Sequence, residues 1–150
     1  MKEILYQMFT DKVFISLIAT LILSEIIKNS ISLYKNKKFI FSKLYEGGGM
    51  PSTHSSLVTS LTASILLNNG FSLLFIVVSV FSIIVIRDSF GVRKYVGEHA
   101  KILNNMLKDQ KLSKSIKSNK KLQENIGHKP IEVIAGIILG IIVSIIVWLI

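Results

Sequence analysis

The chain has no cysteine among its 150 residues. A disulfide framework, a thiolate metal site and a cysteine nucleophile are therefore all excluded. Acidic residues are also scarce, since 9 Asp and Glu stand against 18 Lys and Arg and leave a net charge of +9. Such a balance favours anionic partners, such as nucleic acid, a lipid surface or a phosphorylated ligand.

Charge of either sign is missing from long stretches of the chain. Half of the residues are hydrophobic, and the mean hydropathy is +0.55. Apolar runs alternate with basic segments, which is typical of a small polytopic membrane protein rather than a soluble domain. A bilayer is crossed by about 17–25 residues. The sequence therefore predicts one all-α integral-membrane domain over residues 1–150, with transmembrane helices at about 8–27, 51–68, 71–87 and 131–150.

Basic residues concentrate in two segments between these spans, whereas the Asn68–Gly70 turn and the C-terminus carry none. The positive-inside rule then places both segments in the cytoplasm and both chain ends outside. The same lysines would also attract anionic lipid headgroups. Nucleic acid is not an expected partner, because the longer segment lacks interleaved aromatics and a recognition motif. The basic residues are Lys28, Lys35, Lys37, Lys38 and Lys43, then Arg87, Arg93, Lys94, Lys101, Lys108, Lys111, Lys114, Lys117, Lys120, Lys121 and Lys129.

The segment from Val92 to Asn125 has a different pattern. Its apolar residues recur at helical spacing with Lys and Asn between them, which predicts an amphipathic helix on the membrane surface or capping the bundle. His99 falls in this helix and is interpreted as a solvated or structural residue. Lys111–Lys121 has little apolar content and is expected to be a mobile tether. The spaced apolar residues are Val96, Ile102, Leu103, Met106 and Leu107.

A glycine-rich motif precedes the second span. It comprises Gly47–Ser55 and reads Gly-Gly-Gly-Met-Pro-Ser-Thr-His-Ser. Pro51 suits the first position of a helix, which would leave the amides of Ser52, Thr53 and His54 unpaired at an anion-binding helix end. The histidine adds a titratable proton near neutral pH. The alternative is a glycine-rich turn with an ordinary helix cap.

A second motif begins the last span, where His128 is followed by Pro130 and Glu132. Pro130 again predicts a helix start, with Glu132 in the first turn. A carboxylate there can hold one nitrogen of the His128 imidazole and leave the other for nucleophilic or base chemistry. The alternative is that Glu132 only interacts with the positive end of the helix dipole.

The predicted topology brings both motifs to one membrane face, because the Pro51 and Pro130 helices start there and Arg87-Asp88 ends the third span there. A phosphate site needs a nucleophile or base, an acid and cations, and these residues provide all three. We therefore expect His54 and His128 to face one another across a phosphate-sized gap. The cations would come from Arg87, Arg93 and Lys94, with Asp88 beside them.

These residues resemble a known family. The type-2 phosphatidic acid phosphatases and vanadium haloperoxidases share Pro-Ser-Gly-His and Ser-Arg-x5-His-x3-Asp motifs, which Pro51–His54 and His128–Glu132 resemble with Thr for Gly and Glu for Asp. The divergent PAP2 group is closer, with its Gly-Gly-Met-Pro-Ser-x-His-Ser, Asp-x-x-Gly-Val-Arg-Arg and Leu-Gly-His-x-Pro-x-Glu-Val segments. Here the corresponding segments are Gly48–Ser55, Asp88–Lys94 and Ile126–Val133.

The resemblance implies a phosphatase without metal or other cofactor and, since the group includes small bacterial membrane proteins, a bacterial cytoplasmic membrane as its location. It also suggests a role for each matching residue. His128 would attack phosphorus, Glu132 would orient it, and His54 would protonate the leaving oxygen. Ser52 and the Thr53 amide would hold phosphate oxygens. The phosphatases' Lys-x6-Arg-Pro motif is absent, and Leu122 stands where they have an arginine six residues before the nucleophile.

Two hypotheses follow. The first is a membrane-embedded phosphatase or phosphotransferase acting on a lipid phosphate. The second is a non-catalytic membrane protein of the same fold, a carrier or scaffold that binds anionic lipid or a phosphorylated ligand. A homo-oligomer is compatible with either, since Gly136 and Gly140 form a small-xxx-small pattern that lets helices pack closely in lipid, within one chain or between two.

Overall fold

The computed structural model describes residues 2–36, 49–107, 122–124 and 127–150. Within these residues all regular secondary structure is helical, as the sequence predicts. The glycines at 47 and 48 and the expected tether at 111–121 lie outside the described residues. The helices are α1 (Lys2–Thr10), α2 (Lys12–Asn36), α3 (Thr53–Asn69), α4 (Leu73–Phe90), α5 (Val92–Met106) and α7 (Pro130–Leu149).

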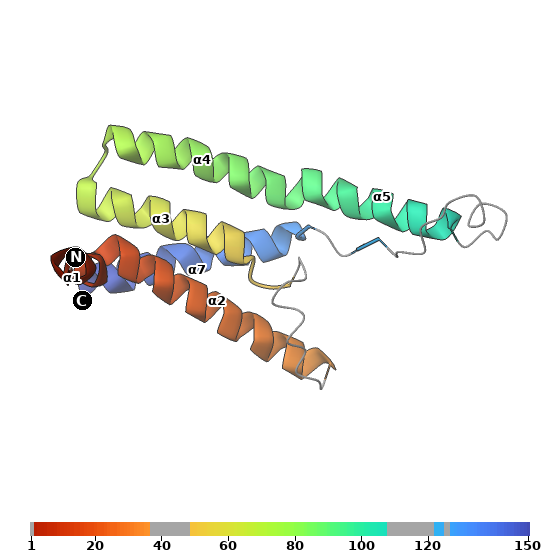
Figure 1. The fold of residues 1–150 in the computed structure, drawn as a ribbon, viewed down its shortest axis with the longest axis horizontal. Helices are drawn as coiled ribbons and strands as arrows, with labels where there is room; N and C mark the ends of the chain where they lie inside the picture. The colour runs from red at the N-terminus through yellow and green to blue at the C-terminus, as the bar shows by residue number, and fades with distance from the viewer. Residues whose placement is uncertain (1, 37–48, 108–121, 125–126) are drawn as a thin grey trace.

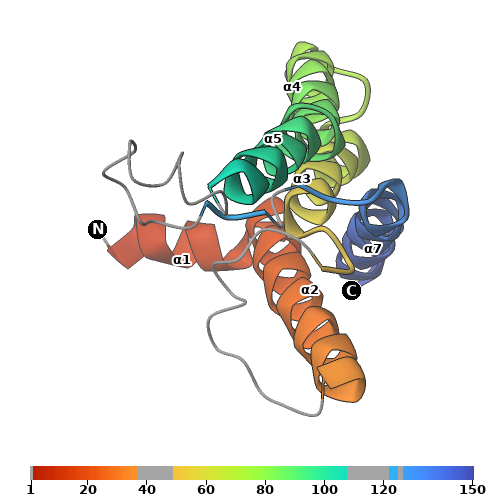
Figure 2. The same ribbon diagram turned by 90° about the vertical axis from the view of Figure 1, so that its right-hand side faces the viewer.

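Helix α3 is the centre of a bundle and packs against α2, α4 and α7 (Figures 1 and 2). Its most extensive contact is with α7. Both chain termini lie at the end of the bundle where α3 turns into α4 (Figure 1). A hydrogen bond from Lys12 Nζ to the Trp148 carbonyl, 3.0 Å long, joins the two ends of the chain there. The starts of α3 and α7 therefore share the opposite end, as the sequence predicts.

Three of the helices are long and apolar enough to cross a membrane: Lys12–Tyr34, the combined Leu73–Met106, and Pro130–Leu149. Helix α3, the remaining expected span, has 17 residues and lies along the inside of the bundle. At about 1.5 Å per residue it is near the lower limit for crossing a hydrocarbon core. The chain is thus an all-α integral-membrane protein.

The first long helix begins and ends later than the sequence predicts. Asp11 accepts a hydrogen bond from the Phe14 amide at 2.9 Å and so caps a new helix that begins at Lys12, after the separate α1. The predicted span ends at Ile27 because charge follows it, yet α2 continues through Lys28 to Asn36. The helix continues because Lys28 is paired inside the bundle, with Glu25 one turn before it.

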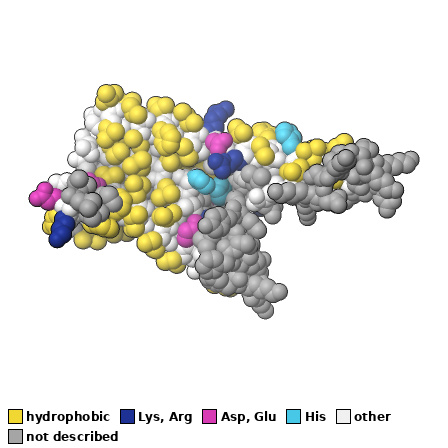
Figure 3. Space-filling model, viewed as in Figure 1, with side chains coloured by type: hydrophobic (Ala, Val, Ile, Leu, Met, Phe, Trp, Pro, Cys, Tyr) yellow, Lys and Arg dark blue, Asp and Glu magenta, His cyan; other side chains and the backbone are white. Residues whose placement is uncertain are grey.

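Small hydroxyl residues fill the interior of the bundle, and most large apolar side chains face outward. Thr20 of α2 donates a hydrogen bond to Ser60 of α3 at 3.0 Å, and Ser60 meets Ser144 of α7 at 3.0 Å. Lipid tails are as apolar as leucine, so helices in a bilayer associate through close packing and hydrogen bonds rather than hydrophobic burial. The apolar outer surface visible in Figure 3 is what a bilayer would cover.

The Gly136–Gly140 pattern is used inside this bundle. Both glycines are buried, and a β-carbon on either would collide with α3, at the carbonyl oxygen of Ser52 or of Ser56. The predicted close packing is therefore confirmed, and its partner is α3 of the same chain. This contact fixes the start of α7 against the start of α3.

The amphipathic helix expected after Val92 is α5, and it continues α4 beyond the end of the bundle (Figure 1). Gly91 lies at the junction, where its amide donates to the Arg87 carbonyl at 2.9 Å and its carbonyl accepts from the Tyr95 amide at 3.3 Å. These bonds keep the helical pattern across the junction. The two helices therefore act as one long rod with a change of direction at Gly91.

Candidate functional site

The first histidine motif forms the start of α3, but the helix begins two residues later than the sequence predicts. Ser52 is the cap, and its side chain accepts from the Ser55 amide at 3.4 Å. Its own amide donates to the Glu132 carbonyl at 2.9 Å. The expectation of an unpaired Ser52 amide is therefore wrong, because α7 packs close enough to accept it. The buried Ser52 joins the two histidine motifs through the backbone.

The second histidine motif has the geometry that its sequence predicts. Pro130 is the first residue of α7, and the Glu132 carboxylate accepts from the Lys129 amide at 3.1 Å. The same oxygen, Oε2, lies 3.1 Å from Nδ1 of His128. Glu132 thus lies at the positive end of the helix dipole and also holds the imidazole, so the two roles considered for this residue are compatible. Because Nδ1 is engaged, any chemistry at His128 falls to Nε2.

The backbone around His128 is fixed by the α4–α5 rod. The His128 amide donates to the Ser89 carbonyl at 2.9 Å. Gly127 has a φ of +99°, and a β-carbon there would lie 2.6 Å from the backbone nitrogen of Lys94. Only glycine allows this approach and this backbone conformation without strain. As a result His128 is buried at a defined position, with only 7% of its surface exposed.

The two histidines face each other, with their ring centroids 6.5 Å apart and their planes tilted by 58°. His54 lies on the exposed side of the first turn of α3, whereas His128 is buried. This separation is well within the range at which two groups can act on one phosphorus atom between them. Figure 3 shows histidine, basic and acidic side chains together where the apolar surface of the bundle ends.

The charged residues at the end of α4 and the start of α5 make different contacts. Arg93 donates from Nε to Asp88 at 2.7 Å, and its charge acts on His54. Lys94 instead faces Glu98 along α5, at 3.9 Å. Arg87 is exposed on the last turn of α4, and it makes no ion pair within the described residues. Of these three cations, Arg93 is the one whose charge acts on His54.

The sequence interpretation missed a second polar cluster, on α2. Lys28 donates from Nζ to Glu25 Oε1 at 3.0 Å and to Thr53 Oγ1 at 2.7 Å. The Thr53 hydroxyl in turn donates to the same Glu25 oxygen at 2.8 Å. The Lys28 side chain is only 14% exposed, and its charge also acts on His54. Lys28 was assigned to a loop, and no local pattern shows that α2 carries it to the start of α3.

The comparisons with known proteins fit this arrangement. The model of the divergent PAP2 family matches residues 9–143, which contain all three motifs. The chain belongs to the divergent PAP2 family. Among its relatives is the uncharacterized membrane protein YuiD of Bacillus subtilis (strain 168), which is 33% identical over 151 residues, covering 93% of this chain and 96% of YuiD. No solved structure matches this divergent PAP2 protein.

The described residues of this divergent PAP2 protein contain no group of three or more His, Cys, Asp or Glu that could hold a metal ion. Membership of the divergent PAP2 family makes this chain a membrane protein related to phosphatases. Its long apolar helices imply a lipid bilayer as its environment.

Proposed function

We propose that this protein is a phosphatase or phosphotransferase that acts on a lipid phosphate at the membrane surface. The observation that carries the proposal is the pair of imidazoles at 6.5 Å, with Glu132 bonded to Nδ1 of His128. A carboxylate in this position keeps the proton on Nδ1 and leaves Nε2 as a nucleophile. The second imidazole can supply the proton that a poor leaving group needs.

The proposed reaction has two steps. Nε2 of His128 attacks phosphorus and forms a P–N bond, while the P–O bond to the lipid alcohol breaks and His54 donates its proton to that oxygen. Water, or a second alcohol in a phosphotransferase, then attacks phosphorus and breaks the P–N bond, and His54 takes up the proton of the attacking hydroxyl. Because one imidazole begins neutral and the other protonated, activity should follow a bell-shaped pH profile.

Phosphate oxygens would be held by cations and helix-end amides. Lys28 and Arg93 are the two cations whose charges act on His54. Thr53 and His54 are the first two residues of α3, so their amides lie at the positive end of the helix dipole. Arg87 and Lys94 remain candidates that this proposal does not need. Ser52, which is fully buried, acts here through the cap of α3 rather than through the ligand.

A second candidate function is binding of a lipid phosphate or anionic headgroup without turnover. It is favoured by the pairing of both cations, because Lys28 already neutralises Glu25 and Arg93 already neutralises Asp88. A carboxylate beside each cation weakens its attraction for phosphate. This candidate predicts that the protein binds phosphorylated lipid and that His128 can be replaced without loss of affinity.

The test is phosphate release by the purified protein from a panel of lipid phosphates in nanodiscs. His128→Ala should lower kcat by at least about 10³-fold, because a nucleophile is lost. His54→Ala should lower it by about 10²–10⁴-fold with a lipid alcohol as leaving group, and by less with a leaving group that needs no proton. Lys101→Ala is the control, since Lys101 is exposed on α5 and lies outside the imidazole pair. Wild-type protein that binds these lipids without releasing phosphate would overturn the proposed catalysis and favour the second candidate function, binding without turnover.

A further inference from the structure

Helix α5 has two faces, and only one of them packs against other described residues of the chain. On the inner face Gly97, Ala100 and Asn104 are buried. The Asn104 amide group donates to the Leu122 carbonyl and to Glu124, both at 2.8 Å, and its oxygen accepts from the Leu122 amide at 2.9 Å. Residues 122–124 are thereby held along this side of α5.

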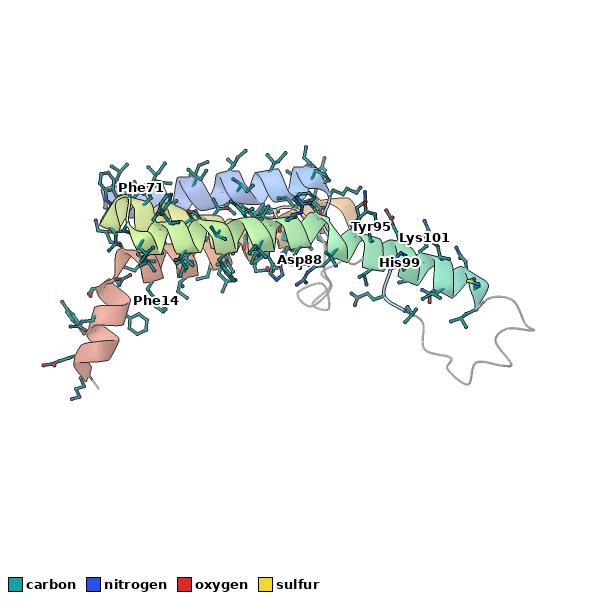
Figure 4. The ribbon with its side chains drawn as sticks, turned by 90° about the horizontal axis from the view of Figure 1, so that it is seen from above. Phe14, Phe71, Asp88, Tyr95, His99 and Lys101 are labelled. Carbon is teal, nitrogen blue, oxygen red and sulfur yellow. The ribbon has the colours of Figure 1, made fainter. Side chains whose placement is uncertain are left out.

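The outer face is apolar and exposed. Its large side chains are between 46% and 63% exposed. They belong to Val92, Tyr95, Val96, Ile102, Leu103 and Met106. Figure 4 shows Tyr95, His99 and Lys101 on the part of α5 that extends beyond the bundle. An apolar face of this kind on a helix outside the bundle needs a partner.

The spacing along this face is that of a coiled coil. Val92, His99 and Met106 are seven residues apart, and Tyr95 and Ile102 fall between them at intervals of three and four. This is the a and d spacing of two heptads, with Val96 and Leu103 widening the stripe at position e. The buried Gly97 and Asn104 then occupy position f, on the side that faces away from such a seam.

The membrane surface is a less suitable partner for this face than another helix. A helix that lies in the membrane plane must turn sharply away from the spanning helix before it, and the backbone bonds across Gly91 continue the helix instead. The 34 residues from Leu73 to Met106 measure about 51 Å, which exceeds a hydrocarbon core of about 30 Å by about 20 Å. Most of α5 would therefore extend past the hydrocarbon core.

We infer that the outer face of α5 is a dimer interface, on which a second copy of this chain docks its own α5 in parallel. All copies of a membrane protein have the same orientation in the bilayer, so a two-fold axis runs along the membrane normal and equivalent helices meet in parallel. Two heptads are short, but confinement in the bilayer raises the effective concentration of the partner. His99 at a central a position would fix the register, as polar residues there do.

The dimer would also brace the proposed site. The inner face of α5 holds residues 122–124, which precede His128 in the chain, and Arg93 belongs to the first turn of the same helix. A rod that extends freely from the bundle can bend at Gly91, whereas a rod paired with its symmetry mate is held from both sides. The interface is separate from the imidazole pair, so it does not depend on the proposed chemistry.

Cysteine cross-linking tests the interface, because the chain has no cysteine of its own. Ile102→Cys and Tyr95→Cys place a thiol at d positions, where equivalent α-carbons of a parallel pair come within the 4.4–6.8 Å that a disulfide spans. Lys101→Cys and Lys94→Cys are neighbouring, exposed controls on another face. In full-length protein in liposomes, we expect the first pair to form disulfide dimers at least about tenfold faster than the controls.

Two outcomes would overturn the inference. Equal rates at all four positions would indicate random collision. Slow rates at all four, with the Ile102→Cys thiol shielded from a water-soluble reagent in liposomes, would show that lipid covers this face. As a second measurement, Ile102→Glu should convert dimers to monomers in nanodiscs counted by single-molecule photobleaching, and the matched Lys101→Glu should leave them dimeric. A monomeric wild-type protein would contradict the interface directly.

Discussion

Glu132 connects the fold to the proposed chemistry through one oxygen atom. Its Oε2 accepts from the backbone of Lys129 and from the ring of His128, each at 3.1 Å. The first bond stabilises the start of α7, and the second sets the orientation of the imidazole. An amide in place of the carboxylate would keep an acceptor for the cap but lose the charge that favours a cationic or reacting imidazole.

We predict that Glu132→Gln lowers kcat for phosphate release by about 10²–10⁴-fold with little change in KM, because the nucleophile loses its orienting charge. The variant should unfold within a few degrees of the wild type, since the cap is retained. Glu132→Ala should lose both activity and about 1 kcal/mol of stability. Steady-state kinetics and thermal unfolding measure the two effects. Full turnover by Glu132→Gln would contradict the orienting role.

Lys28 and Glu25 form an ion pair whose two functions can be separated. Glu25 Oε2 is buried without a hydrogen-bond partner within the described residues, so this carboxylate depends on Lys28 and Thr53 at its other oxygen. Removing one partner of a pair of this kind leaves an uncompensated charge, whereas removing both charges does not. A double variant therefore isolates the contribution of the cation to ligand binding.

Lys28→Met should lower both thermal stability and the affinity for a lipid phosphate. The double variant Lys28→Met with Glu25→Gln should recover the stability, while the affinity stays about tenfold or more below that of the wild type, because one charge-assisted contact is lost. Unfolding in detergent and binding to lipid phosphate in nanodiscs provide the two readouts. Recovery of the affinity together with the stability would show that Lys28 is structural only.

The contact between α3 and α7 decides whether the two motifs meet. Gly136 and Gly140 let α7 approach so closely that the Ser52 amide reaches the Glu132 carbonyl, 2.9 Å away. Hydroxyl pairs such as Ser60 with Ser144, at 3.0 Å, continue the same contact toward the other end. A small shift of α7 would therefore displace His128 relative to His54.

Gly136→Leu and Gly140→Leu should each lower the melting temperature in detergent and abolish phosphate release, because a larger side chain must push α7 away from α3. Overpacking of this kind costs about 1–3 kcal/mol. Ile138→Leu is the control, since Ile138 lies between them on the exposed side of α7. Unchanged stability in both glycine variants would contradict the observed packing.

The bundle as a whole has two unlike ends. One end holds both termini and the α3–α4 turn, and the other holds the starts of α3 and α7 and the base of α5 (Figure 1). The imidazole pair lies at this second end, since His54 and His128 stand at the starts of α3 and α7. The basic segments of the sequence all join helices at the second end. By the positive-inside rule this end should face the cytoplasm, where a soluble alcohol or water would reach the site.

Single cysteines test this orientation in intact cells. Asn69→Cys, at the exposed end of α3, should react with a membrane-impermeant thiol reagent added outside. Gln123→Cys, exposed between α5 and α7, should react only after the membrane is permeabilised. The cysteine-free parent gives the background. The reverse labelling pattern would place the site on the outer face and exclude a cytoplasmic substrate.

Local pattern alone was enough to predict much of this protein. Long charge-free runs determine that the chain is helical and membrane-spanning, because a bilayer accepts few other structures. Pro130 determines the start of α7, and the spacing of Glu132 from His128 determines their hydrogen bond, because both lie within one helical turn. The meeting of His54 with His128 also followed from the sequence, since alternating spans place two helix starts at one end.

Only the tertiary structure decided which polar groups complete the site. Lys28 follows an apolar run and so was predicted to end a helix, but the packing of α2 against the start of α3 pairs it with Glu25 and Thr53 and keeps it helical. The Ser52 amide was expected to be free, and the approach of α7 gave it a partner. These contacts join residues far apart in the chain, and their energies depend on distances that no local pattern encodes.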